Sequence, residues 1–145
     1  MTHIKLFKEN SEYDRKKQIE PTYQKVASSP IGTILPESDI YVYAEYLHTR
    51  PDDWTEGDLG NRIEKSSRYQ LLEVDIRDID IAEWDINDDV VDDYMQILDE
   101  NNGYCPPIIL EKKSDNELYC IIDGIHRANA VSEAGYTKIN SWVGL

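Results

Sequence analysis

The segment that most constrains this chain is residues 121–130, which read Ile-Ile-Asp-Gly-Ile-His-Arg-Ala-Asn-Ala. Its apolar start is typical of a buried strand, and the Asp-Gly pair is typical of a tight turn that leads into a helix. Gly124 permits a positive φ and a close backbone approach, and a helix that begins there offers unpaired N–H groups and a positive dipole end. The segment therefore predicts an anion site at a strand-to-helix turn. The residues predicted to form it are Asp123, Gly124, Ile125, His126 and Arg127.

Each polar side chain of this turn has a distinct expected role. Arg127 carries a planar fork suited to phosphate oxygens, and His126 can donate a further hydrogen bond. Asp123 could bind a ribose or an amine, help to hold Mg²⁺ beside a nucleotide, or cap the helix. With Asp123 as a cap, the same residues would form a tight structural turn and nothing more. The residues alone leave these alternatives open.

The pattern around the turn predicts a compact mixed α/β unit. Leu72, Val74 and Ile76 alternate with charged residues, as in a half-buried strand. A helix with an apolar stripe follows, capped by Asn87 or Asp88. The next expected elements are a stop at Asn102-Gly103, a Pro106-Pro107-led strand at 108–110, a turn at 111–117, a strand at 118–122, a helix from about 125 to 134 that ends at Gly135, and a closing strand at 139–143.

Residues 1–70 are harder to interpret, and we assign them as an N-terminal extension or lid. Residues 12–28 have helical character, but Pro21 is expected to end or kink any single helix there. Residues 40–47 have apolar side chains at helical spacing with Ser38 or Asp39 as a cap, although a strand is the alternative. Residues 52–61 resemble a loop. The tyrosines of this region are expected to pack in the core or an interface: Tyr41, Tyr43 and Tyr46.

Charge is concentrated in the middle of the chain. The net charge is −14, and residues 73–100 hold twelve acidic residues and one arginine, which is −11 of that total. Such a field repels DNA, RNA and anionic membranes, so we expect neither DNA binding nor membrane association. Without a signal peptide pattern or an apolar run of about 20 residues, a cytoplasmic location is expected. Cys105 and Cys120 have no zinc-ligand spacing and are expected to be buried, reduced thiols.

Residues 71–145 resemble the ParB/sulfiredoxin superfamily. The resemblance lies in the Pro-Pro-led strand, the hairpin, the Asp-Gly-x-His-Arg turn, and the segments 133–136 and 139–143. It implies a bound nucleotide whose phosphates lie on the turn: ATP or ADP, with CTP as a further option, and Mg²⁺. Sulfiredoxins place a catalytic Cys where this chain has Ile125, which argues against sulfinic acid reduction. Partition proteins have an Arg-rich variant of the turn and a following DNA-binding domain, and we do not expect this chain to act in DNA partitioning.

The small-molecule kinases of the superfamily are the remaining branch, and they resemble this chain in their His-Arg turn. The resemblance implies phosphoryl transfer to a small hydroxylated metabolite, as in a serine kinase, with a carboxylate as the base. Glu83, beside Trp84, is the expected base, and Asp85 is the second choice. The alternative function is a non-enzymatic acidic interaction protein, such as an antitoxin, immunity or inhibitor protein. Residues 73–100 would then bind a basic protein partner or mimic nucleic acid.

Overall fold

The computed structural model describes residues 2–48, 58–81 and 86–145. The elements, in chain order, are α1 (Thr2–Ala27), β1 (Ile34–Pro36), α2 (Glu37–Leu47), α3 (Asp58–Ile63), β2 (Arg68–Asp75), a 3-10 turn (Ile76–Asp78), β3 (Ile79–Asp80), α4 (Asp88–Glu100), β4 (Ile108–Leu110), β5 (Tyr119–Asp123), α5 (Ile125–Glu133) and β6 (Lys138–Gly144). This is the mixed α/β architecture that the sequence predicts. None of the described helices is long and apolar enough to cross a membrane.

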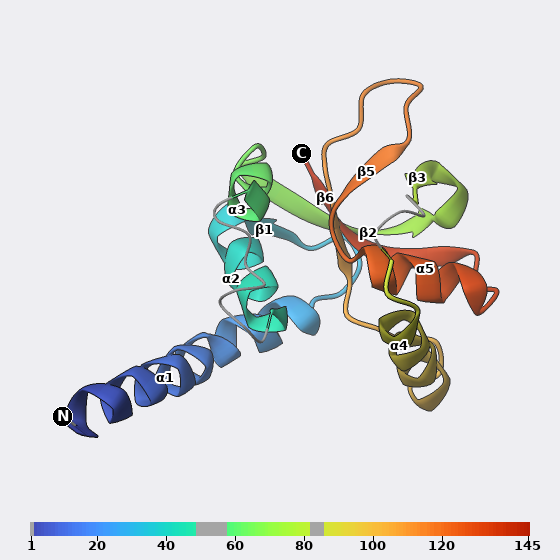
Figure 1. Cartoon of the computed structure of the whole chain (residues 1–145). Coiled ribbons are helices and arrows are strands. Elements are labelled where there is room, and N and C mark those ends of the chain that lie inside the picture. The colour runs from blue at the N-terminus through green and yellow to red at the C-terminus, as the bar shows by residue number, and fades with distance from the viewer. Residues whose placement is uncertain (1, 49–57, 82–85) are drawn as a thin grey trace.

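The strands form one mixed sheet in the order β1-β2-β6-β4-β5-β3. β4 and β5 are antiparallel neighbours, which confirms the predicted hairpin. The closing strand β6 lies between β2, to which it is antiparallel, and β4, to which it is parallel. β5 lies between β4 and the short edge strand β3, and the turn after β5 leads directly into α5 (Figure 1).

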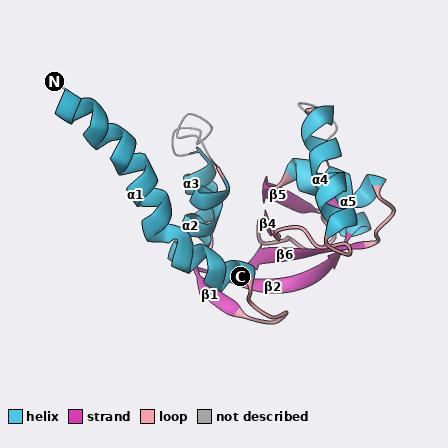
Figure 2. Cartoon of the chain, turned by 90° about the horizontal axis from the view of Figure 1, so that it is seen from below, coloured by secondary structure: helices cyan, strands magenta, loops and turns pink. Residues whose placement is uncertain are grey.

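Both faces of the sheet are covered by helices. Figure 2 shows α1, α2 and α3 on one side and α4 and α5 on the other. One hydrophobic cluster joins the N-terminal helices to Leu71, Ile109 and Trp142. A second joins α4 and α5 to Ile108 and Leu110. Successive residues of β4 therefore point into different clusters, which explains why this strand is continuously apolar.

From α4 onward, the elements begin and end within one residue of where the sequence predicts. Asn87 caps α4, because its side-chain oxygen accepts hydrogen bonds from the N–H groups of Asp89 and Val90. Asn102 and Gly103 both have positive φ and end this helix. Gly135, with φ +88°, follows the end of α5 in the same way.

The first half differs from its prediction in three places. α1 continues through Pro21, which lies on the exposed side of the helix, where water can satisfy the carbonyl group that loses its partner. α2 confirms the helical alternative for residues 40–47, but it begins without a capping side chain, so the predicted cap at Ser38 or Asp39 is wrong. Of the loop predicted at residues 52–61, residues 58–61 are part of α3, and residues 52–57 lie outside the described residues.

Strand β2 also differs in detail from the strand predicted at residues 72–76. β2 begins at Arg68, and Ile76 lies in the 3-10 turn after it. Tyr69 and Leu71 face the N-terminal helices, while Val74 faces α4 and α5, so the strand has buried side chains on both faces. The predicted alternation holds at the end of the strand, where exposed Glu73 stands beside buried Val74. The additional cover comes from the N-terminal helices, whose packing a pattern within residues 72–76 does not reveal.

Candidate functional site

The turn between β5 and α5 is built around Gly124. This residue has φ +109°, in the left-handed region that favours glycine, and it stands immediately before the first residue of α5. A Cβ at this position would overlap the side chain of Ile108 on β4 and lie 2.9 Å from Nη2 of Arg127. Glycine is therefore required both for the backbone conformation and for the close packing of the turn against the sheet.

α5 begins without a side-chain cap among the described residues. Its first hydrogen bond runs from the N–H of Ala128 to the carbonyl oxygen of Gly124, so the N–H groups of Ile125, His126 and Arg127 precede the helical ladder. Helix α4 differs, because the side chain of Asn87 caps its first turn. An uncapped first turn with a glycine before it leaves backbone donors and the positive end of the helix dipole available to an anion.

The guanidinium of Arg127 points into the protein. Its side chain is 4% exposed, and Nη1 donates to the carbonyl oxygens of Pro106 (3.0 Å) and Pro107 (2.8 Å). Nη2 donates to Oδ2 of Asp123 at 3.2 Å. The expected contact with a phosphate stays a prediction. The described role of Arg127 is to hold the Pro-Pro segment against the turn and to place a positive charge behind the first turn of α5.

Asp123 does not cap α5, so the capping alternative for this residue is wrong. Its carboxylate instead lies between two donors: Oδ1 is 3.2 Å from Nε2 of His48, and Oδ2 accepts from Arg127. Burial raises the pKa of Asp123, but the hydrogen bond from His48 and the charge of Arg127 outweigh it, and the pKa lies below its usual value. Both carboxylate oxygens already accept hydrogen bonds from protein groups. The geometry therefore favours a structural role for Asp123, in which it positions its neighbours, and not a role as a Mg²⁺ ligand.

His126 connects the first turns of α4 and α5. Its Nε2 accepts a hydrogen bond from the backbone N–H of Asn87 at 3.1 Å. An imidazole nitrogen that accepts carries no proton, so neutral His126 holds its proton on Nδ1. The expectation that His126 can donate a hydrogen bond thus applies to Nδ1, because the other nitrogen is occupied.

Two residues of the N-terminal half reach this site, and sequence reasoning assigned neither to it. His48, directly after α2, contacts Asp123 across 75 positions of sequence. Tyr43 is fully buried, donates its hydroxyl hydrogen to the carbonyl oxygen of Pro107 and lies 3.5 Å from Nη1 of Arg127. The prediction that Tyr43 packs in the core is confirmed. The spacing of histidines and carboxylates along the chain gives no sign of a partner so distant, and hence His48 was missed.

The expected bases, Glu83 and Asp85, lie outside the described residues, and their role stays a prediction. The described chain resumes at Ile86, and the hydrogen bond from Asn87 to His126 places this point beside the turn. Among the described residues no group of three or more His, Cys, Asp or Glu side chains is arranged to hold a metal ion.

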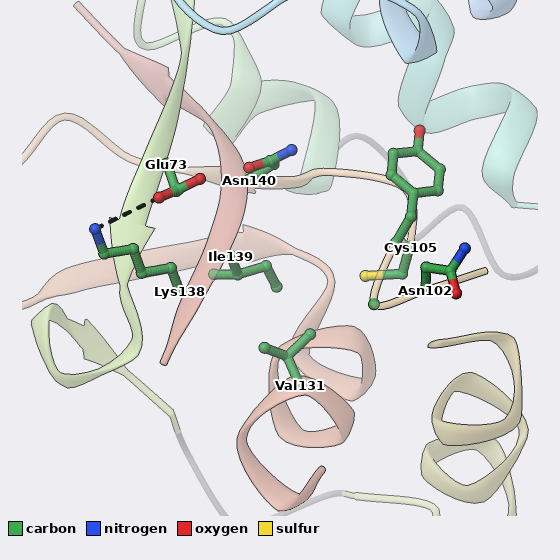
Figure 3. Close-up of a pocket in the computed structure, with 9 residues that line it drawn as sticks. Glu73, Asn102, Cys105, Val131, Lys138, Ile139 and Asn140 are labelled. Carbon is green, nitrogen blue, oxygen red and sulfur yellow. Dashed lines mark ion pairs between the residues drawn. The ribbon is translucent and has the colours of Figure 1, made fainter. Parts of the chain in front are cut away.

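A separate hollow of about 250 Å³ contains none of the turn residues. Figure 3 shows it between the connection from α4 to β4, α5, and the neighbouring strands β2 and β6. Glu73 and Lys138 form an ion pair at its rim (3.4 Å), and both side chains are more than half exposed. Because these charges neutralise each other in water, the hollow offers less to an anion than the turn does, and we place the candidate site at the turn.

Comparison with known proteins gives two similarities. Residues 61–144, more than half of the chain, match the ParB N-terminal domain family. The crystal structure of sulfiredoxin from Arabidopsis thaliana is similar with a TM-score of 0.43 and 18% sequence identity, over 51% of this chain and 83% of that one. A comparison with curated protein sequences found no match.

Proposed function

Because the chain belongs to the ParB N-terminal domain family, we propose that it binds a nucleotide with the phosphates at the β5–α5 turn. The observation that carries this proposal is the uncapped first turn of α5, which begins after a glycine with φ +109°. The N–H groups of Ile125, His126 and Arg127 would donate to phosphate oxygens, and Nδ1–H of His126 would add a side-chain donor. Arg127 would contribute a positive charge from behind the turn.

The proposed ligand is ATP or ADP, with CTP as the further option, together with Mg²⁺. The metal ion matters here because the chain has a net charge of −14, which opposes the approach of a free nucleotide. Bound Mg²⁺ reduces the charge of the ligand and so lowers this repulsion. The same net charge supports the proposal that the protein does not bind DNA.

The proposed reaction is phosphoryl transfer to a small hydroxylated metabolite. This chemistry requires positioned phosphates, charge neutralisation and an oriented nucleophile, and it needs little covalent help from the protein. The turn supports the first requirement through its backbone donors, and the helix dipole together with Mg²⁺ would supply the second, because Arg127 is already paired with Asp123. Glu83, with Asp85 as the alternative, stays the sequence-based proposal for the base that accepts the hydroxyl proton.

A thermal unfolding titration with ADP, ATP and CTP, each with Mg²⁺, tests the binding proposal. At about 100 times its dissociation constant, a nucleotide should stabilise the native state by about 2.7 kcal/mol. His126→Ala should weaken this stabilisation because it removes the Nδ1–H donor, whereas Lys113→Ala, in the exposed hairpin loop, should not. Absence of stabilisation by all three nucleotides would refute the proposal.

The exposed acids of α4 favour one second candidate function. Six acidic side chains of this helix are exposed: Asp88, Asp89, Asp92, Asp93, Asp99 and Glu100. A basic protein partner could bind this surface, as the alternative of a non-enzymatic interaction protein requires. A pull-down with the whole chain at low and high salt tests it. A specific partner that is released by salt and is indifferent to nucleotide supports this candidate, and only salt-resistant partners would count against it.

A further inference from the structure

We infer that the hollow beside β6 binds a small free α-amino acid, which takes the place of a missing strand residue. Its ammonium group donates to the carbonyl oxygen of Lys138, and its carboxylate accepts from the backbone N–H of Asn140. The hollow measures about 250 Å³ and lies between β6 and the connection from α4 to β4 (Figure 3). It contains none of the residues of the β5–α5 turn, so the inference does not rest on the proposed function.

The pairing of β6 with β2 determines which backbone groups of β6 face the hollow. Directly before β6, the N–H of Ile76 donates to the carbonyl oxygen of Thr137 at 2.9 Å, and the register is regular from there along the pair. In an antiparallel pair, successive residues direct their backbone groups to opposite sides. Odd-numbered residues of β6 therefore bond to β2, whereas Lys138 and Asn140 direct their N–H and C=O groups toward the side of β4.

β4 is too short to cover this side of β6. The two strands are parallel, and their pairing begins at Ile108 and Ser141. A longer β4 would bring Pro106 into the ladder, two positions before Ile108. The residue at that position would donate its N–H to the carbonyl oxygen of Lys138 and accept from the N–H of Asn140.

Pro106 does not fill this position in the ladder. It has no N–H group, and its carbonyl oxygen accepts from Nη1 of Arg127 at 3.0 Å. Among the described residues, no backbone hydrogen bond joins Lys138 or Asn140 to residues 101–107. The hollow is thus a gap in the sheet, where a carbonyl acceptor of Lys138 and an N–H donor of Asn140 have no strand partner.

An α-amino acid matches this gap because it carries the two groups that Pro106 does not supply. Its ammonium group is a donor and its carboxylate is an acceptor, one residue apart, like the N–H and C=O groups of a strand residue. Glu73 and Lys138 also line the hollow, with opposite charges. Their own ion pair is more than half exposed and contributes little stability, so both side chains can turn toward the charges of the ligand at small cost.

The position of the ligand also indicates its side chain. Residues two apart along a strand face the same side of the sheet, and Ile108 points into the hydrophobic cluster with α4 and α5. A side chain in the place of Pro106 would point the same way, toward Val131 and Cys105 (Figure 3). A short apolar side chain suits these neighbours, whereas a charged one would be desolvated without a partner.

The test is an NMR titration of the whole chain with L-alanine at millimolar concentrations. We expect saturable shifts at the backbone amides of Asn140 and Cys105. Acetylated alanine lacks the ammonium group and alanine amide lacks the carboxylate, so each should bind at least about 10-fold more weakly. Glu73→Gln and Lys138→Gln should each weaken the binding of L-alanine, whereas Arg77→Gln, the matched control at an exposed ion pair outside the hollow, should not.

The other outcomes would overturn the inference. Absence of saturable shifts with L-alanine, L-valine and glycine would show that the hollow takes no small amino acid. Equal binding of alanine and its two blocked forms would show that the ligand does not replace a strand residue. Shifts confined to the β5–α5 turn would place the amino acid elsewhere. None of these results bears on nucleotide binding, which the thermal unfolding titration tests by itself.

Discussion

Arg127 donates to Asp123 at 3.2 Å across one turn of backbone, and the two side chains are 4% and 13% exposed. This buried pair joins the last residue of β5 to the first turn of α5 and closes the loop around Gly124. A charge that is buried with its partner is tolerated, but removal of either member leaves the other unpaired. The pair is therefore where substitutions should affect the fold most strongly.

Arg127→Ala should lower the free energy of unfolding by about 3–5 kcal/mol, because it removes the positive charge beside the buried Asp123 carboxylate and the guanidinium donor of two proline carbonyl oxygens. Urea unfolding measures this loss. Arg77→Ala is the matched control, since Arg77 pairs with Asp75 at 88% exposure, and it should have no measurable effect. Equal losses in the two variants would contradict the role assigned to Arg127.

Asp123 should make stability depend on acidic pH. The pKa of Asp123 is lowered in the folded state, so its contribution is fully present above the unfolded-state pKa of about 3.9 and is lost as the pH falls through the folded value. The stability difference between the wild type and Asp123→Asn should accordingly shrink below about pH 4. Acid unfolding followed by circular dichroism tests this. A constant difference down to pH 2 would show that the ionised carboxylate is not what stabilises the turn.

Gly124→Ala should be more destabilising than Gly135→Ala. Both glycines have positive φ, +109° and +88°, so alanine is strained at either position by about 1–2 kcal/mol. A Cβ at Gly135 meets nothing within 4 Å, whereas one at Gly124 overlaps Ile108. The overlap should add about 1–3 kcal/mol to the loss at Gly124. Thermal unfolding of the two variants compares them directly, and similar losses would argue against tight packing of the turn on β4.

Much of the second half could be predicted because its signals are local. Asn87 as a cap, Asn102-Gly103 as a stop and Gly135 after α5 each act within one turn of backbone. The candidate turn at residues 123–127 was found in the same way, from an apolar run, a glycine and a helical pattern. These features need no knowledge of the rest of the chain.

The missed features depend on tertiary contacts. α1 continues through Pro21 because that side of the helix faces solvent, and this follows from how the helix packs on α2. The contact between His48 and Asp123 and that between Tyr43 and Arg127 join residues 75 and 84 positions apart. A pattern along the chain cannot indicate which distant residues meet. Sequence reasoning therefore located the turn but not the side chains that the N-terminal half brings to it.

The two cysteines should differ in reactivity. Cys105 is 6% exposed, and burial raises the pKa of its thiol, an effect that the charge of Arg127 only partly offsets. Cys120 is exposed on β5, so the prediction that both thiols are buried is wrong for this one. A thiol reagent should modify Cys120 rapidly and Cys105 only after local unfolding, which mass spectrometry with a Cys120→Ser control can resolve. Rapid modification of Cys105 in the folded protein would contradict its packing against α4 and α5.

The most direct test of the central claim is an NMR titration of backbone amides with Mg·ATP. We predict saturable shifts centred on the N–H groups of Gly124, Ile125, His126 and Arg127, because the phosphates should bind at the first turn of α5. Shifts that leave this turn unchanged and centre on the hollow at Asn102–Cys105 would contradict the account, as would no shift at all.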